Sequence, residues 1–366
     1  MTFSLVSCQT PKPPVLNQKI AIGTYTKKEG HVDGKGDGIY LGLINMENGQ
    51  IVIEDTIKGI VNPSYVQIKD QTLYAVSELA DASIQTIGEF HRIDLKTKSK
   101  ETILIGGDAP CHVNLISEAG YAVVTNYVNS ISLVNIAQGL KTVDIISPEG
   151  YTQGPPRQES SHPHMSHIAP DGNTLLVSDL GLDAIIHYDY KSGKLVEIGR
   201  TATMPRSGPR HMATDEKNGI VYVLNELNHT IESFQWMSDS VSMKRLSISS
   251  TLDEGITDEN VNCSAIKIHP SRKFLYSANR GINQHSEQSI TAFKIEEPGR
   301  LIKIGKYSTK GLIPRDFSIT PDGTYLVVAN QDSDNIITFL INADGSLKDA
   351  RHELMVNTPV CIKFYE

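Results

Sequence analysis

Short apolar runs separated by turns rich in proline and glycine follow one another along the whole chain. Some runs, such as residues 289–295, alternate apolar and polar side chains, which is the period of a half-buried β-strand. Others, such as residues 325–328, are apolar throughout, as expected of a strand buried on both faces. No stretch shows a convincing helical period. The pattern therefore predicts an all-β fold.

A short strand-like unit that begins with proline recurs along the chain. Its starts lie 45–54 residues apart, at Pro63, Pro110, Pro163, Pro209, Pro314 and Pro359, with the same pattern from Cys263 without the proline. After each start come a turn, an apolar strand, an alternating strand and a glycine turn that leads into a last strand. Four strands at a period of about fifty residues are typical of a β-propeller blade.

The two ends of the sequence each hold part of a blade. The last unit, from Pro359 to Glu366, is one strand long, and residues 19–57 supply three strands without a leading proline unit. Together they complete a seventh blade, so we predict a seven-bladed propeller closed by pairing the C-terminal strand with N-terminal strands. Closure removes the open sheet edges. We expect the propeller to span residues 19–366, with a leader and linker over residues 1–18.

Composition narrows the class of protein. The 366 residues include 34 Lys and Arg against 42 Asp and Glu, a net charge of −8. A protein with this excess of negative charge is not expected to bind nucleic acid. The apolar runs are far shorter than the roughly 20 residues that cross a bilayer, so we expect no transmembrane segment. The cysteines, Cys8, Cys111, Cys263 and Cys361, form no CxxC pair and suggest neither a disulfide framework nor a zinc site.

The first residues of the sequence suggest where in the cell the protein is located. Residues 5–8, Leu-Val-Ser-Cys, resemble the lipobox of bacterial lipoproteins, and a Pro-rich stretch follows Cys8. The basic region and the long apolar region of a signal peptide are missing, so an accidental match in a disordered tail is the alternative. We expect a lipid anchor at Cys8 and a periplasmic or surface location in the cell envelope. An accidental match would make the protein cytoplasmic.

Ionisable and hydrogen-bonding residues recur at one end of the predicted blades. In an antiparallel blade, the start of the first strand and the end of the second lie at the same mouth of the channel. The first-strand starts include His164, Arg210, His211 and Arg315, and the second-strand ends include Glu78, Glu226, Arg280 and Gln331. Polar strand ends often only cap turns. That explanation does not account for arginine after the proline, nor for Arg210 and His211 beside Glu226, so we predict a functional site at this mouth.

Other motifs give weaker signals. His162 and His164 share one face of a strand, as zinc ligands can, but no fourth ligand is evident, so we predict no metal and no cofactor. Residues 33–38 are only loosely similar to a calcium loop. The sequence contains neither a GxSxG nucleophile elbow nor a Walker loop.

The motifs as a set resemble a known family. They are Gly23-Thr-Tyr-Thr26, Asn62-Pro-Ser-Tyr65, Pro163-His164, Gly208-Pro-Arg-His211, Asn225-Glu226-Leu227, His269-Pro270, Asn279-Arg280 and Pro314-Arg-Asp-Phe317. Over nearly all of the chain from Lys19, they resemble the seven-bladed propeller lactonases, the bacterial propeller-type 6-phosphogluconolactonases. That family also includes fungal carboxy-muconate lactonising enzymes. The resemblance implies metal-free hydrolysis of a sugar lactone, with 6-phosphogluconolactone opened to 6-phosphogluconate.

The resemblance and the chemistry together suggest roles. Opening a lactone needs a base for water and a positive group over the developing oxyanion. We expect His211 as base with Glu226 as its partner, the reversed assignment being the alternative, and Arg210 facing the oxyanion. The predicted substrate-binding residues are His164, His269, Arg280, Arg315 and Gln331.

Three readings of the substrate stay open. An envelope location would favour an unphosphorylated or uronic lactone over the phosphorylated one, since the latter is made in the cytoplasm. A muconate-type lactone is a further alternative within the family. A propeller that binds a ligand or a protein without catalysis is the alternative outside it. The sequence leaves the oligomeric state open.

Overall fold

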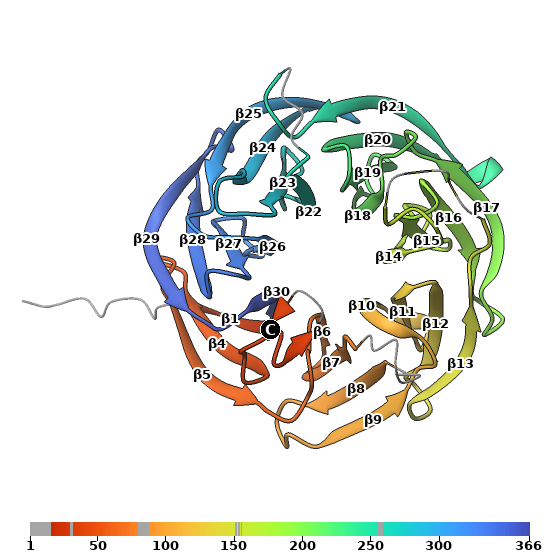
Figure 1. Ribbon diagram of the computed structural model, residues 1–366, viewed down its shortest axis with the longest axis horizontal. Coiled ribbons are helices and arrows are strands. Elements are labelled where there is room, and N and C mark those ends of the chain that lie inside the picture. Colours follow the sequence, from red (N-terminus) through yellow and green to blue (C-terminus); the bar gives the residue numbers. More distant parts are fainter. Residues whose placement is uncertain are drawn as a thin grey trace, which may run out of the picture.

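Seven four-stranded antiparallel sheets are arranged around a central axis (Figure 1). The computed structural model describes residues 16–29, 32–79, 88–150, 152, 154, 156–254 and 259–366. Over these ranges the predicted all-β, seven-bladed propeller is confirmed. The predicted anchor residue, Cys8, lies outside the described residues. None of the helices in these ranges is long and apolar enough to cross a membrane.

Each blade has an inner, a second, a third and an outer strand. The inner strands are β30 (Pro359–Tyr365), β6 (Val66–Lys69), β10 (Asp108–Ile116), β14 (Pro163–Ile168), β18 (Pro209–Asp215), β22 (Val261–Ile268) and β26 (Pro314–Ile319). The second strands are β1 (Asn17–Thr24), β7 (Thr72–Ser77), β11 (Tyr121–Val128), β15 (Leu175–Asp179), β19 (Ile220–Asn225), β23 (Phe274–Gly281) and β27 (Tyr325–Asn330).

The remaining elements lie farther from the axis or in the connections. The third strands are β4 (Ile39–Asn45), β8 (Glu89–Asp94), β12 (Ser130–Asn135), β16 (Ala184–Asp189), β20 (Thr230–Met237), β24 (Gln288–Glu297) and β28 (Asn335–Ile341). The outer strands are β5 (Ile51–Ile57), β9 (Lys100–Leu104), β13 (Lys141–Ile146), β17 (Val196–Ala202), β21 (Ser242–Ser250), β25 (Arg300–Ser308) and β29 (Leu347–Met355). A short ribbon pairs β2 (Lys28–Glu29) with β3 (Val32–Asp33), and 3₁₀ turns cover Ser117–Ala119 and Ser238–Ser240.

The C-terminal strand closes the ring as predicted. β30 is the inner strand of the sheet β30-β1-β4-β5 and pairs antiparallel with β1, from Lys19 opposite Tyr365 to Thr24 opposite Pro359. Ile362 of β30 is fully buried. Both ends of the chain therefore contribute strands to one blade.

Burial follows the position of a strand in its blade. β19 and β27 are buried at every residue, whereas the outer strand β17 is exposed or half-buried along its length. The apolar side chains fill the space between neighbouring blades; for example, Ile22 of β1 packs in one cluster with Val327 of β27. This packing holds the inner and second strands in fixed register around the channel.

A repeated backbone hydrogen bond places the second-strand ends at one mouth. The residue before the inner-strand proline has a left-handed φ in five blades, at Asn62, Ala109, Gly208, Ile313 and Thr358. In four of these blades its carbonyl accepts the N–H of the residue just after the second strand. The four donors are Glu78 to Asn62, Glu226 to Gly208, Gln331 to Ile313 and Tyr25 to Thr358.

A β-bulge at the start of the inner strand sets the direction of the side chains that this strand contributes to the mouth. In six of the seven inner strands the register skips at the residue after the proline or its equivalent. In β18, Pro209 lies opposite Asn225 and His211 lies opposite Leu224, so Arg210 is the extra residue. Successive side chains of a regular strand point to opposite faces, and a bulge re-aims one of them. The bulge therefore lets Arg210 and His211 face the same site.

Candidate active site

Glu226 is the centre of the arginine cluster, which we define as Arg157, Arg210, Arg280, Arg315, Glu78 and Glu226. Its carboxylate is fully buried. Oε1 accepts hydrogen bonds from Arg157 Nη1 and Arg280 Nη2, both at 2.7 Å, and Oε2 lies 2.8 Å from Arg210 Nε. The predicted meeting of Arg210 with Glu226 is therefore present, together with two further arginines.

These contacts fix the charge of Glu226. Burial alone would raise the pKa of the carboxyl, but Arg157, Arg280 and Arg210 together hold it well below its usual range. The group is ionised at neutral pH and is a weak proton acceptor. Burial, followed by the repulsion of Arg280, lowers the pKa of Arg210 to about 9, so that guanidinium stays charged at neutral pH.

Arg210 contacts His211 as well as Glu226. Its Nη1 lies 3.1 Å from Nε2 of His211 and also donates to the carbonyl of Ser264. A guanidinium only donates hydrogen bonds, so Nε2 of His211 must carry the lone pair and Nδ1 the proton. In the described chain, no hydrogen bond joins His211 to Glu226. The expected carboxylate partner of His211 is thus replaced by an arginine that bridges the two residues.

His211 lies against two other imidazole rings, those of His164 and His112. The ring centroid of His164 lies 5.3 Å from that of His211, and that of His112 lies 6.1 Å from it, both edge-on. Burial, followed by the charge of Arg210, lowers the pKa of His164 and of His211 well below the ordinary value. Both imidazoles are therefore neutral at neutral pH, each with a lone pair on one ring nitrogen, and each holds an added proton only weakly.

Arg315 lies beside Glu78 and Tyr25. Its Nη2 is 3.3 Å from Oε2 of Glu78, and its guanidinium lies 5.1 Å from the ring centroid of Tyr25. Burial lowers the pKa of Arg315, but Tyr25 and Glu78 act against it, and the net shift is upward. This arginine is a fixed positive charge at the mouth.

The remaining predicted binding residues lie in different places. Gln331 is buried at the end of β27, where its Nε2 donates to Asp332 and its Oε1 has no hydrogen-bond partner. His269 follows the last residue of β22, at the end of the blade opposite to the mouth, and its Nε2 lies 2.9 Å from the carbonyl of Gly323. Because strand direction separates His269 from the arginine cluster, we do not include it in the site.

Arg157 was missed by the sequence reasoning. It lies on the connection between β13 and β14, outside the blade repeat, with a left-handed φ of 78°. Its Nε donates to the hydroxyl of Tyr127 at 3.0 Å while Nη1 binds Glu226. A loop residue has no register position, so no periodic signal could have placed it there.

His162 and His167, on either side of His164 in the sequence, have different partners. His162 Nδ1 lies 2.8 Å from the carbonyl of Tyr127, whereas His167 Nε2 lies 2.8 Å from the hydroxyl of Thr214. Among the described residues, no group of three or more His, Cys, Asp or Glu side chains is arranged to hold a metal ion.

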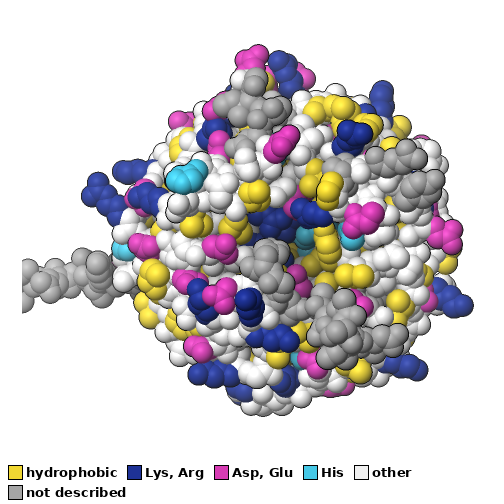
Figure 2. All heavy atoms as spheres, in the orientation of Figure 1, with side chains coloured by type: hydrophobic (Ala, Val, Ile, Leu, Met, Phe, Trp, Pro, Cys, Tyr) yellow, Lys and Arg dark blue, Asp and Glu magenta, His cyan; other side chains and the backbone are white. Residues whose placement is uncertain are grey.

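Basic side chains and histidines gather at the centre of the face that Figure 2 shows.

Replacing Glu226 by glutamine is expected to destabilise the protein. Removing one partner of a buried ion pair typically costs about 3–5 kcal/mol, because the other charge is left uncompensated. Three arginines would lose their carboxylate here, so thermal unfolding should shift clearly to lower temperature. Glu296→Gln, which removes the exposed partner of Arg300, should leave the melting curve unchanged. Equal melting of both variants would show that solvent, not Glu226, balances the arginines.

The fold and the site together define a class of protein: a β-propeller whose channel mouth is buried, positively charged and lined by histidines. The family described as "Lactonase, 7-bladed beta-propeller" matches residues 19–364, and the chain belongs to this family. A relative is the 6-phosphogluconolactonase of Bacillus subtilis, which is 29% identical over 353 residues that cover 94% of this chain and 97% of the relative.

Two solved structures are also similar. One is a protein from Lactobacillus plantarum, with a TM-score of 0.85 and 26% identity, covering 96% of this chain and 100% of the other. The second is a candidate 6-phosphogluconolactonase from Bacteroides fragilis, with a TM-score of 0.83 and 27% identity, covering 98% of this chain and 100% of the other.

Proposed function

We propose that this protein hydrolyses the lactone of a sugar acid that carries a negative charge, with 6-phosphogluconolactone as the first candidate. One observation carries the proposal. The arginine cluster holds four guanidinium groups against two carboxylates, which leaves two positive charges in excess at a buried mouth of a chain whose net charge is −8. Guanidinium groups bind phosphate and carboxylate with paired hydrogen bonds. The Bacillus subtilis relative is named for this activity.

The proposed base is His211. Its neutral imidazole presents the lone pair on Nε2, and the contact with Arg210 already selects this tautomer. A water bound in the place of that contact would give its proton to Nε2 as its oxygen attacks the lactone carbonyl. The tetrahedral intermediate then breaks the bond between the carbonyl carbon and the ring oxygen, and the protonated imidazole returns the proton to that leaving oxygen. The reversed assignment, in which Glu226 is the base, is disfavoured because guanidinium groups already occupy both oxygens of its carboxylate. We assign Glu226 instead to positioning the three arginines.

Arg210 is proposed to stabilise the oxyanion. It is the only member of the cluster that contacts both His211 and Glu226 among the described residues. A fixed donor near the attacked carbonyl stabilises the charge that develops on its oxygen. Arg157, Arg280 and Arg315 then remain for the anionic end of the substrate. His164, whose ring faces His211, would contact the sugar between them.

The direct test is hydrolysis of lactones measured against their spontaneous opening. Phosphorylated and unphosphorylated gluconolactone are compared at equal concentration with the purified protein. We expect a higher kcat/KM for the phosphorylated lactone, because the cluster has excess positive charge. Preference for the unphosphorylated lactone would indicate a neutral or uronic substrate. No acceleration of any lactone would favour a binding module over an enzyme.

Arg280→Ala should raise KM for an anionic lactone about tenfold or more and leave kcat nearly unchanged. A hydrogen bond to a charged group contributes about 1.5–3 kcal/mol, and each 1.4 kcal/mol is a factor of ten. An uncharged lactone should show no such rise. Arg300→Ala, at an exposed arginine of the outer strand β25, is the matched control. A fall in kcat alone for Arg280→Ala would place Arg280 at the reacting carbonyl instead.

A further inference from the structure

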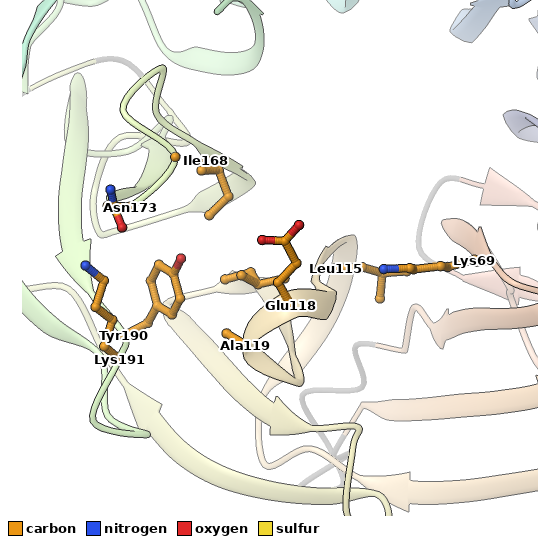
Figure 3. Close-up of a pocket in the computed structure, with 10 residues that line it drawn as sticks. Lys69, Leu115, Glu118, Ala119, Ile168, Asn173, Tyr190 and Lys191 are labelled. Atoms are coloured by element: carbon orange, nitrogen blue, oxygen red, sulfur yellow. The ribbon is translucent and has the colours of Figure 1, made fainter.

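The arginine cluster is buried, so an entering anion must displace a contact that the cluster already makes. The side chains of Glu226 and Arg210 are almost fully covered. The structure also has a cavity of about 510 Å³, but its lining includes Ile116 and Ile168, the last residues of β10 and β14 (Figure 3). The cluster lies at the starts of the inner strands, so this cavity belongs to the opposite end of the channel and gives no entry to the cluster.

Arg157 makes the contact that is easiest to displace. Its side chain is 37% exposed, against 14% for Arg280 and 2% for Arg210. It lies on the connection between β13 and β14, whereas the other two arginines lie within β23 and β18. Its Nε and Nη1 have hydrogen-bond partners, and in the described chain its Nη2 has none. Arg157 is therefore the arginine of Glu226 that a ligand reaches first.

Glu226 stays paired when Arg157 leaves it. Arg157 Nη1 and Arg280 Nη2 both lie 2.7 Å from Oε1 of the carboxylate. Arg210 Nε lies 2.8 Å from Oε2. Without Arg157, each carboxylate oxygen still has a guanidinium partner, so the large cost of an unpaired buried charge does not arise. Because Arg157 and Arg280 now reach the same oxygen, one anion can contact both.

Tyr127 holds the other side of the Arg157 guanidinium. Its hydroxyl accepts a hydrogen bond of 3.0 Å from Nε of Arg157. The tyrosine ring stacks on His162, with the centroids 4.6 Å apart, and lies edge-on to His164 at 5.8 Å. These ring contacts fix the position of the hydroxyl. Since the N–H groups of a guanidinium donate in different directions, Arg157 can keep Tyr127 through Nε while its Nη groups change partner.

We propose that Arg157 gives the site its selectivity for phosphorylated lactones by exchanging partners. When the substrate binds, the Nη groups of Arg157 leave Glu226 and, together with Arg280, donate to the phosphate group. Tyr127 is a positioning residue that holds Nε throughout the exchange. Guanidinium groups bind phosphate with paired hydrogen bonds, so donors that now face a carboxylate suit a phosphate as well. This inference rests on the proposed lactone hydrolysis and names the residue that selects its substrate.

Binding of the hydrolysis product tests the selectivity without turnover. Calorimetry compares 6-phosphogluconate with gluconate, which differ by the phosphate group alone. We expect the full chain to prefer 6-phosphogluconate and Arg157→Ala to reduce this preference about tenfold or more, the contribution of one hydrogen bond to a charged group. Arg206→Ala is the matched control, since Arg206 is an exposed arginine with a left-handed φ on the connection between β17 and β18. Equal preference in both variants, or no preference in the full chain, would overturn the proposal.

Tyr127→Phe separates positioning from charge. It removes the hydroxyl that holds Nε, but it keeps the ring against His162 and the charge of Arg157. KM for the phosphorylated lactone should rise severalfold, less than in Arg157→Ala, and the effect should fall on KM more than on kcat. Arg157→Lys, which keeps the charge without paired donors, should recover only part of the preference. A Tyr127→Phe variant that loses kcat with KM unchanged would contradict the positioning role.

A crystal structure with 6-phosphogluconate shows the exchange directly. We expect the Nη groups of Arg157 within hydrogen-bond distance of the phosphate and no longer of Glu226, with Arg280 still bound to Oε1. If Arg157 stays on Glu226 in the complex, the exchange is wrong even where the protein hydrolyses lactones. The proposed function fails by a different result, the absence of acceleration for every lactone, on which neither the binding preference nor the crystal structure depends.

Discussion

Replacing His211 by alanine should lower kcat for lactone hydrolysis by about 10²–10⁴-fold, the usual contribution of a positioned general base. KM should change little, because His211 is assigned to the water and not to the anionic end of the substrate. His211 is buried beside Arg210 and His164, so its removal leaves a polar gap that water can fill. The measurement is steady-state kinetics on the preferred lactone, with circular dichroism to verify folding.

Two further variants sharpen this prediction. Arg210→Ala should also lower kcat, by about 10²–10³-fold, the typical loss for one oxyanion donor. His352→Ala, on the outer strand β29, should change neither constant. If both His211→Ala and Arg210→Ala keep the kcat/KM of the unaltered protein, the reaction occurs elsewhere than at this mouth.

The pH dependence follows from the direction of the pKa shift. Burial and then Arg210 hold the pKa of His211 well below 6.5, so the imidazole stays unprotonated as the pH falls through that value. Activity that needs the neutral imidazole should therefore persist at pH 6 and decline only in more acidic solution. A decline centred near pH 6.5 would show that the base is a histidine with an ordinary pKa.

The repeat made the fold predictable from sequence. Proline starts, Gly-marked turns and the lone C-terminal strand each have a direct structural cause, and together they defined the number of blades and the closure by β30. The same register predicted that Arg210 and Glu226 meet, because strand starts and strand ends are fixed by pairing alone. The observed backbone bond from Glu226 to Gly208 is that pairing.

Features outside the repeat could not be predicted. Within the repeat, the bulge that turns Arg210 to the same side as His211 follows the inner-strand proline, but the same residues also fit a regular strand, so the skip in register was not predicted. Arg157 comes from a loop whose path depends on tertiary contacts with Tyr127 and Glu226. His269 matched a family motif, yet the direction of β22 carries it to the opposite end. Motif identity and position in the blade are therefore separate evidence, and position decides which residues can act together.

We expect the propeller to lose its stable fold when its C-terminal strand, β30, is deleted. Deleting residues 359–366 removes the inner strand of one blade, including Val360 and Ile362, both buried. Removing a buried aliphatic side chain down to alanine costs about 2–5 kcal/mol, and whole domains are stable by only about 5–15 kcal/mol. The deletion also removes the backbone hydrogen bonds between β30 and β1 and uncovers β1 as an open edge.

We therefore expect the shortened chain to be insoluble or to melt without a cooperative transition, as followed by circular dichroism and calorimetry. Removing Glu366 alone, which lies beyond β30, should leave the transition in place. A synthetic peptide of residues 359–366 should restore cooperative melting when added during refolding, since an extended peptide can complete a sheet with an open edge. A shortened chain that melts cooperatively near the temperature of the full chain would mean that the pairing of β30 with β1 does not hold the ring closed.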